Sequence, residues 1–287
     1  MNYKKTITFD YFDFLHTRDE NPAQLPFHSH IHECYELLYF VSVDGVLNVE
    51  GTDYSLVPGS ILITRPGEFH QLTILSDHPY ERYSFRFYPQ SISAFDPDLE
   101  MLAPFHNRLL GERNHYVSTD AERQATFEPP LNSEPSVDIP AELARARVYS
   151  LFVKLLCDIY SEFIRNDNAS HDRGNGTNPR AQAIINYINN HLSGDLSRNE
   201  LSKQFFLSES QINRLIKKST GLSAGQYITL KRMHLARKLF IEGQSIRKVC
   251  DACGFNSYPA FFIAYKKHFG RSPTNDFPTI DQHRSSP

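Results

Sequence analysis

The second half of the chain contains one short helical pattern twice. The segment Leu215–Gly221 (LIKKSTG) is followed 49 residues later by the similar segment Ala264–Gly270 (AYKKHFG). Apolar residues upstream also match, 48 residues apart: Leu201 with Val249, Phe205 with Cys253, and Leu207 with Phe255. The one-residue slip falls in a turn, so each copy is predicted to be a helix, a short turn, a second helix and a glycine stop. The repeat therefore predicts that residues 179–277 are all helical and contain two similar units.

Capping residues and apolar spacing place the helix boundaries. The predicted helices of the two units are Arg198–Phe205, Ser208–Ser219, Ser245–Cys253 and Ser257–Phe269, and Ala224–Glu242 joins the units. Ser208 and Ser257 are suitable N-caps, and Pro259 lies in a first helical turn, where proline is tolerated. This is the helix-turn-helix arrangement, whose second helix enters the major groove. A rigid joining helix could place two such helices ~34 Å apart on one face of a duplex.

The charge distribution separates this arrangement from an ordinary helical bundle. Residues 180–271 contain 15 Lys and Arg against 5 Asp and Glu, whereas residues 1–179 contain 14 against 26, so the net charges are +10 and −12. A basic block beside an acidic one is typical of chains in which one domain binds nucleic acid. Charge alone would also fit a solvated basic surface. Together with the repeat and its two Lys-Lys pairs, it favours double-stranded DNA as a partner.

The helical region also resembles the DNA-binding domain of AraC-type bacterial transcription regulators. The segments that carry the resemblance are Cys253–Tyr258, Phe261, Lys266–Gly270, Ser272-Pro273, Leu207-Ser208 and Ile216–Gly221, within residues 195–277. The resemblance implies that Ser210, Asn213 and Arg214 face the bases from the first recognition helix. Arginine suits guanine and asparagine suits adenine. Lys217 and Lys218 stand at the C-terminal end of that helix, where cations also suit the helix dipole.

The second recognition helix departs from the family pattern. The positions that match the base-facing residues of the first helix are Pro259, Phe262 and Ile263, and Ile263 stands where an arginine is common. Base recognition there would be apolar, through thymine methyl groups, or weak. Three further residues of this helix complete the predicted DNA-binding set: Tyr258, Lys266 and Lys267.

The first 130 residues are predicted to be mostly β-structure. The predicted strands are Glu36–Val43, Val46–Glu50, Tyr54–Val57, Ile61–Thr64 and Tyr80–Tyr88, with turns at Gly45, Gly51-Thr-Asp53 and Pro58-Gly59. The last of these strands alternates with period two. One face carries Tyr83, Phe85 and Phe87, and the other carries Arg82, Ser84 and Arg86. Short strands at this spacing are typical of a sandwich or barrel.

A cluster of histidines in this β-region resembles the two cupin motifs. His30, His32, Glu36 and His70 match, one for one, the four positions that converge inside metal-binding cupins. Arg65 stands where cupins usually have proline, and Ile74 stands where a late asparagine is usual. We therefore expect these four residues, with Arg82 and Ser84, to line an effector pocket without a metal. The alternative is a site for Fe, Mn or Zn, which such donors suit.

Residues 141–165 are predicted to form one amphipathic helix. Its apolar stripe comprises Val148, Phe152, Leu155, Ile159 and Phe163. The stripe either packs on the β-region or forms the seam of a dimer, and we expect it to mediate dimerisation. The polar stretch Asn166–Asn178 follows as a linker. The predicted domains are 1–140 for effector sensing, 141–165 for dimerisation or packing, 166–178 as linker, and 179–287 for DNA binding.

Several classes of protein are excluded. No apolar run approaches the ~18 residues of a transmembrane helix, and Asp10 and Asp13 interrupt any signal-peptide core. The 4 cysteines are too few for a disulfide framework, which favours a reducing, cytoplasmic location. Cys250 and Cys253 form a lone C-x-x-C, best interpreted as buried small residues.

The predicted fold is α+β and multidomain: an N-terminal cupin-like β-barrel plus a helix, then an all-α domain of tandem helix-turn-helix units. The predicted function is sequence-specific transcription regulation, controlled by a small-molecule effector, which the family resemblance suggests is a carbohydrate. No enzymatic activity and no cofactor are expected. Predicted partners are DNA, the effector, a second copy of the chain and RNA polymerase, but no membrane. The alternatives are a metal-dependent cupin dioxygenase or isomerase fused to a DNA-binding domain, and an architectural DNA binder with an inert barrel.

Overall fold

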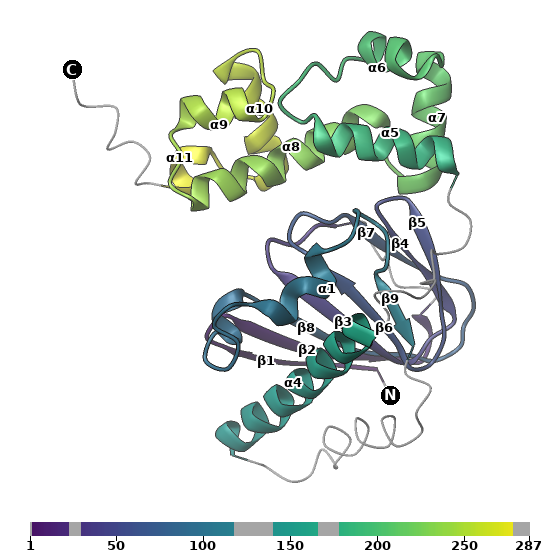
Figure 1. Cartoon of the computed structure of the whole chain (residues 1–287), viewed down its shortest axis with the longest axis vertical. Helices are drawn as coiled ribbons and strands as arrows, with labels where there is room; N and C mark the ends of the chain where they lie inside the picture. Colours follow the sequence, from purple (N-terminus) through teal and green to yellow (C-terminus); the bar gives the residue numbers. More distant parts are fainter. Residues whose placement is uncertain (1, 23–29, 118–139, 166–177, 278–287) are drawn as a thin grey trace, which may run out of the picture. The chain divides into compact units, whose positions relative to one another are not determined.

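A computed structural model describes residues 2–22, 30–117, 140–165 and 178–277 (Figure 1). The chain divides into two compact units, residues 1–176 and 177–287. All of the predicted linker except Asn178 lies outside the described residues. Within the described ranges, no helix is both long and apolar enough to cross a membrane.

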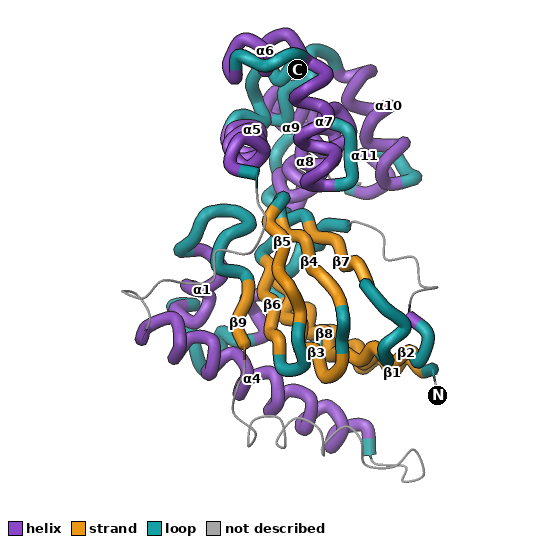
Figure 2. Tube along the Cα trace, turned by 90° about the vertical axis from the view of Figure 1, so that its right-hand side faces the viewer, coloured by secondary structure: helices purple, strands orange, loops and turns teal. Residues whose placement is uncertain are grey.

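The N-terminal unit is β-rich. Its strands are β1 Tyr3–Phe9, β2 Phe12–Asp19, β3 Tyr35–Ser42, β4 Gly45–Val49, β5 Thr52–Leu56, β6 Ser60–Thr64, β7 His70–Ile74, β8 Tyr80–Phe87 and β9 His115–Val117. One sheet has the order β1-β2-β8-β3-β6-β9 and the other has the order β5-β4-β7. Figure 2 shows the strands of both sheets in this unit. Buried residues of both sheets, such as Leu38 on β3 and Leu47 on β4, share one apolar core. The barrel-like sandwich predicted from the sequence is therefore present.

The two faces of β8 meet different surroundings. Tyr83, Phe85 and Phe87 pack in an apolar core that also contains residues of the helix α4 (Ala141–Arg165). Because side chains alternate along a strand, Ser84 and Arg86 point to the opposite face, toward the interior between the sheets. Both hydrogen-bond Glu36 of the neighbouring strand β3. The alternation read from the sequence therefore separates a packing face from a polar, site-bearing face.

The apolar stripe of helix α4 packs against the β-sheet of the same protomer. Val148, Phe152, Leu155 and Ile159 are buried in the core that also contains Phe85 of β8, and Figure 1 shows α4 crossing this sheet. The expectation that the stripe forms a dimer seam is therefore wrong, because its side chains are already covered by the β-sheet. The short elements η2 Pro89–Ser91, η3 Glu100–Leu102 and α1 Ala103–His106 lie between β8 and β9 in sequence.

In the described residues of the C-terminal unit, helices are joined by turns and short loops, and no strand is present. Its helices are α5 Pro179–Asn190, α6 Arg198–Phe205, α7 Glu209–Thr220, α8 Ala224–Ile241, α9 Ile246–Ala252, α10 Tyr258–Phe269 and α11 Pro273–Asp276. Ser208 forms a capping box with Gln211 at the start of α7, and the Ser257 side chain accepts from Ala260 N at the start of α10. Gly221 and Gly270 end these two helices in the left-handed conformation. Both helix-turn-helix units predicted from the repeat are present.

The core of the second unit accounts for the lone C-x-x-C. Cys250 and Cys253 are buried with Phe261 and Tyr265 of α10. Burial raises the pKa of the Cys253 thiol to about 12, so the thiol remains protonated at neutral pH. These cysteines act as small apolar residues, as the sequence suggested.

Candidate functional site

Four side chains predicted from the sequence meet inside the β-domain. One potential ligand atom from each of His30, His32, Glu36 and His70 lies within 4.8 Å of those of the other three. His70 begins β7, and the backbone of His30 pairs with it through two hydrogen bonds of 3.1 Å. Glu36 lies on β3, and His32 stands four residues before it. The structure therefore brings together residues from two segments about 35 positions apart in the sequence.

Glu36 is bound differently through its two oxygens. Its Oε1 accepts hydrogen bonds from Ser84 Oγ at 2.7 Å and from Arg86 Nε at 3.1 Å. Its Oε2 lies 3.2 Å from His70 Nε2 and 3.5 Å from His32 Nε2. Burial alone would raise the pKa of Glu36, but His70, His32 and Arg86 hold it well below its usual value. The carboxyl group is therefore an anion, with one oxygen directed at two imidazoles.

The orientation of His70 is fixed by a backbone carbonyl. His70 Nδ1 lies 3.1 Å from the carbonyl oxygen of Glu68, which can only accept, so Nδ1 carries the proton. His70 Nε2 is directed at Glu36 Oε2, 3.2 Å away. Burial lowers the pKa of His32 to about 3, so the His32 ring is neutral at neutral pH. Within the described residues, His32 Nε2, Glu36 Oε2 and His70 Nε2 are buried without a hydrogen bond.

Three buried polar atoms of ligand type therefore face one another. Buried polar atoms are normally paired, and a set of two imidazoles and a carboxylate is a common ligand set for divalent transition metals. An outer hydrogen bond that fixes the imidazole tautomer is typical of such sites. A pocket without a metal was predicted from the sequence, partly because Ile74 stands where an asparagine is usual. In the structure, the backbone carbonyl of Glu68 provides an outer contact of this kind to His70 Nδ1.

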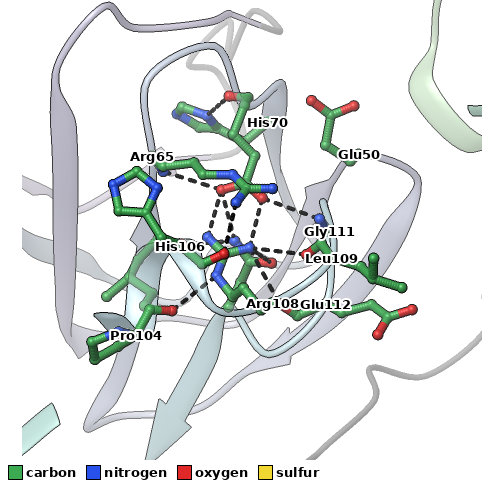
Figure 3. Close-up of polar contacts among 12 residues, drawn as sticks. Glu50, Arg65, His70, Pro104, His106, Arg108, Leu109, Gly111 and Glu112 are labelled. Carbon is green, nitrogen blue, oxygen red and sulfur yellow. Dashed lines mark hydrogen bonds and ion pairs between the residues drawn. The ribbon is translucent and has the colours of Figure 1, made fainter. Parts of the chain in front are cut away.

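A buried ion pair holds the turn that carries the Glu68 carbonyl. Arg108 Nη1 and Nη2 each lie 2.7 Å from one carboxylate oxygen of Glu68, and both side chains are almost completely buried. Backbone N–H groups of Arg65 and Gly111 donate to the same carboxylate. Figure 3 shows this network around Arg108. Burial opposes ionisation of Glu68, but Arg108 holds its pKa at about 2, so the pair stays charged and the turn before His70 is fixed.

A small pocket lies beside the histidine cluster. Its volume is about 220 Å³, and it is lined by Lys4, Thr6, Asp13, Phe14, Leu15, Ser84 and Arg86. Ser84 and Arg86 thus line the pocket while their side chains hydrogen-bond Glu36. Arg82, which the sequence analysis grouped with Ser84, lies over the Tyr80 ring instead and does not line this pocket. Lys4 and Asp13 were missed because β1 and β2 were not recognised as strands.

The outward face of α7 carries the residues predicted to bind DNA. Ser210, Arg214, Lys217 and Lys218 are exposed. Asn213 is also exposed, but its Oδ1 accepts a hydrogen bond of 3.1 Å from the backbone N–H of Ala224, the first residue of α8. Asn213 therefore helps to begin the joining helix, and one of the two lone pairs of its oxygen is engaged there.

The outward face of α10 is largely apolar. Pro259 and Ile263 are exposed, and 67% of the Ile263 surface is accessible. Tyr258 and Phe262 are half-buried, and their ring centroids lie 5.9 Å apart. The Lys266-Lys267 pair is exposed near the C-terminal end of the helix. The predicted residues therefore share one outward side, but only the lysines carry charge.

Arg232 of the joining helix connects the two helix-turn-helix units. Its Nε and Nη2 donate to the carbonyl oxygens of Leu192 and Gly194, which follow α5, at 3.0 and 2.8 Å. The same guanidinium lies 5.7 Å from the centre of the Phe255 ring in the second unit. This residue was not singled out from the sequence, because nothing in its spacing distinguishes it from the other basic residues of α8.

Comparisons with known proteins match both halves of the chain. Residues 17–106 match the family described as AraC-like ligand binding domain, and residues 201–277 match a helix-turn-helix domain. The chain is 24% identical over 255 residues to the HTH-type transcriptional activator RhaS of Pectobacterium atrosepticum, covering 87% of both proteins. It is 40% identical over 92 residues to the probable transcriptional regulator LumQ of Photobacterium leiognathi, covering 32% of this chain and 37% of LumQ. A solved structure of ToxT from Vibrio cholerae is 15% identical with a TM-score of 0.35, covering 93% of this chain and 98% of ToxT.

Proposed function

Because this chain belongs to the AraC family of transcription regulators, we propose that an effector bound in its β-domain controls DNA binding by its two helix-turn-helix units. The observation that carries the proposal is the order of the two family matches, with the AraC-like ligand binding domain before the helix-turn-helix domain. The effector acts by favouring one of two arrangements of the protein, so it must bind them with different affinities. The proposal includes no catalytic reaction.

In the first unit, base recognition is assigned to Ser210 and above all to Arg214. The exposed guanidinium of Arg214 can donate two parallel hydrogen bonds to guanine. Lys217 and Lys218 are assigned to phosphates, which carry no sequence information. Asn213 retains its amide N–H groups and one lone pair of its oxygen for a base, because that oxygen accepts a single hydrogen bond from the start of α8.

The effector proposed for the 220 Å³ pocket is a small, polar, hydroxylated molecule of the size of a sugar. Pockets for drug-sized ligands are roughly 300–1,000 Å³, so this pocket favours a smaller ligand. Lys4, Asp13, Ser84 and Arg86 offer both donors and acceptors for hydroxyl groups. Since Ser84 and Arg86 also bind Glu36, a ligand in the pocket would compete for contacts of the histidine cluster.

A second candidate function of the β-domain is metal binding at this cluster. It is favoured by the three buried polar atoms of His32, Glu36 and His70 that have no hydrogen bond, to which His30 adds a fourth potential ligand atom. These residues fit one divalent ion of Fe, Mn or Zn. A bound ion would supply a Lewis-acid centre that an oxygen of the effector could approach. The metal would then belong to effector sensing, not to the dioxygenase or isomerase chemistry of an enzyme.

The assembly in which the regulator acts is also a proposal. We expect a homodimer in the cytoplasm that contacts RNA polymerase when bound to DNA. The apolar stripe of α4 is covered within the protomer, so the dimer must use another surface. Leu143 and Ile164, near the two ends of α4, are exposed large apolar residues on this helix.

Genomic occupancy of the full-length protein tests the regulatory function. We expect discrete promoter sites whose occupancy changes when the effector is present. The genes beside these sites identify the chemical class of the effector. Uniform occupancy that follows DNA content would contradict sequence-specific regulation, and occupancy that no growth condition changes would favour an architectural DNA binder.

Metal analysis tests the second candidate separately. The purified protein is stripped with a chelator, loaded with Fe(II), Mn(II) or Zn(II), and its bound metal is counted by mass spectrometry. We expect one ion per chain, lost in His70→Gln and retained in His78→Gln, a matched change at an exposed position. No stoichiometric metal in the wild type, or equal binding by both variants, would contradict the assignment. Thermal unfolding with and without the ion gives a second readout that does not depend on DNA.

A further inference from the structure

The two recognition helices present different chemistry at equivalent positions. When Leu215–Gly221 is aligned with Ala264–Gly270, the base-facing positions pair as follows: Ser210 with Pro259, Asn213 with Phe262, and Arg214 with Ile263. The three side chains of α7 all carry hydrogen-bonding groups. The three of α10 carry none, since proline, phenylalanine and isoleucine have no side-chain donor or acceptor. The outward face of α10 therefore cannot read a base edge through hydrogen bonds from these positions.

The apolar face of α10 is not a part of the core. Phe261 and Tyr265 of the same helix are completely buried and fill the inward side. Ile263 lies on the opposite side and is 67% exposed, while Phe262 beside it is half-buried. An isoleucine that is two-thirds exposed gains little stability from burial. Its exposure therefore leaves an apolar surface available to a partner.

The neighbouring charges identify that partner as anionic. Lys266 and Lys267 are exposed one turn further along α10, at the positions that Lys217 and Lys218 occupy on α7. A lysine pair suits phosphates, and the two units share this pair even though their outward faces differ. In the major groove of DNA, the C5-methyl group of thymine is the apolar group on a base edge, and it is flanked by phosphates. A duplex with thymines thus matches both the apolar and the basic part of α10.

We propose that α10 recognises thymine through contacts of Phe262 and Ile263 with C5-methyl groups, while Lys266 and Lys267 bind the adjacent phosphates. This inference rests on the proposed DNA-binding function and specifies how its second unit reads sequence. The operator is then chemically asymmetric. The half-site under α7 contains a guanine read by Arg214, and the half-site under α10 contains thymines read by their methyl groups.

Replacing thymine by uracil tests the inference directly. Uracil keeps the base pair and its O4 acceptor and removes only the methyl group, so hydrogen-bonded recognition is unaffected. The probe is a duplex selected from random sequence by the full-length protein. We expect each uracil under α10 to weaken binding about three- to five-fold, the effect of one buried methyl group. The same change under α7 is the control and should have a smaller effect.

Two protein variants assign the methyl effect to its residues. Ile263→Ser should bind thymine and uracil duplexes nearly equally, because the apolar contact is gone. Lys267→Ala should keep the uracil effect but reduce the salt dependence of binding. Since Ile263 is exposed, its replacement should leave thermal unfolding unchanged, which checks that the variant folds.

The outcomes separate the inference from the function on which it rests. If the second half-site is protected from cleavage but uracil there has no effect, the methyl contacts are wrong and DNA binding stands. If Ile263→Ser loses transcriptional control with unchanged DNA affinity, the apolar face binds a protein and the inference is overturned. If neither half-site is protected, the proposed function fails together with the inference.

Discussion

The two helix-turn-helix units have the same backbone conformation in the turn after their first helix, but different residues occupy its left-handed position. In both units the residue after the first helix, or one position later, must adopt a left-handed conformation. The first unit places Phe206 there, with φ +53°, and the second unit places Gly254 there, with φ +65°. Glycine adopts this conformation freely, whereas a residue with a side chain pays roughly 1–2 kcal/mol. Phe206 is also 94% exposed, so its ring gains no packing in the protomer.

The surroundings of the two turns explain the difference. A Cβ atom added to Gly254 would lie 2.6 Å from Arg232 Nη2 and 2.6 Å from the carbonyl oxygen of Leu192. Arg232 binds that carbonyl and holds the two units together, so the second turn leaves no space for a side chain. The Phe206 side chain points to solvent, and its turn tolerates any residue that can bear the strain. Both turns contain a left-handed residue, but glycine is required only where neighbouring atoms leave no space for a Cβ atom.

The largest expected effect is that of Gly254→Ala. Left-handed backbone should cost about 1–2 kcal/mol, and displacement of Arg232 or Leu192 should cost a further ~1–3 kcal/mol of unfolding free energy. Urea denaturation of the full-length protein, followed by circular dichroism, measures the sum. The matched control is Gly225→Ala, because a Cβ there meets nothing within 4 Å and lies in helix α8. Equal stability of both variants would contradict the role given to the second turn.

The next effect concerns base recognition by the first unit. Arg214→Ala should weaken binding to a specific site by about 1–3 kcal/mol and relax preference at one base pair. Lys218→Ala should weaken binding to all sequences nearly equally. Fluorescence anisotropy with specific and unrelated duplexes distinguishes the two variants. A uniform loss in Arg214→Ala would assign this arginine to phosphate and remove the contrast between α7 and α10.

Acidification should lower the stability of the second unit, where α8 packs against α10. His234 on α8 contacts His268 and Phe269 of α10, and burial lowers its pKa to about 3, with further lowering by His268, Lys231 and Arg237. Between pH 6.5 and 3 the unfolded chain binds a proton at this residue and the folded chain does not. Stability should therefore fall as the pH falls through this window.

Replacing His234 measures how much of the acid-induced loss of stability comes from this residue. From pH 7 to pH 5 the wild type should lose on the order of 1–2 kcal/mol that His234→Gln does not lose. His191, which follows α5 in the first unit, is exposed, so His191→Gln serves as the control and should behave like the wild type. An identical pH profile for His234→Gln and the wild type would show that His234 is protonated in the folded protein.

The smallest predicted effect is an increase in stability. Phe206→Gly should raise the unfolding free energy by about 1 kcal/mol, because the left-handed conformation then carries no strain and no packing is lost. Thermal unfolding of the full-length variant measures the change. A loss of stability would mean that the Phe206 ring is covered in solution, by a second copy of the chain or by another segment.

The parts of the structure that a local pattern specifies were predictable from the sequence. The helices of both units, their serine caps and the strands β3–β6 and β8 follow from periodicity, capping and turn residues. The strand β1 was missed because it is an exposed edge strand with little apolar alternation, as Lys4 and Lys5 show. The strands β2, β7 and β9 were also missed, since they carry mixed polar and apolar residues or are very short.

In the candidate sites, too, local motifs were predictable and contacts between distant residues were not. His30, His32, Glu36 and His70 were found because they form two recognisable motifs. The Glu68–Arg108 pair joins residues 40 positions apart, and no local pattern indicates it. The engagement of Asn213 with Ala224 depends likewise on how α7 packs beside the start of α8. Such contacts between distant residues arise from tertiary packing, and they could not be predicted from the sequence.

The claim that two similar units read DNA by different chemistry is tested most directly by selecting binding sites from random duplexes. The wild type and Arg214→Ala are compared as full-length proteins. We expect two half-sites about one helical turn, ~10 bp, apart, one with a guanine that Arg214→Ala no longer selects and one rich in thymine that it still selects. A single half-site, or a change of both half-sites in Arg214→Ala, would contradict the account.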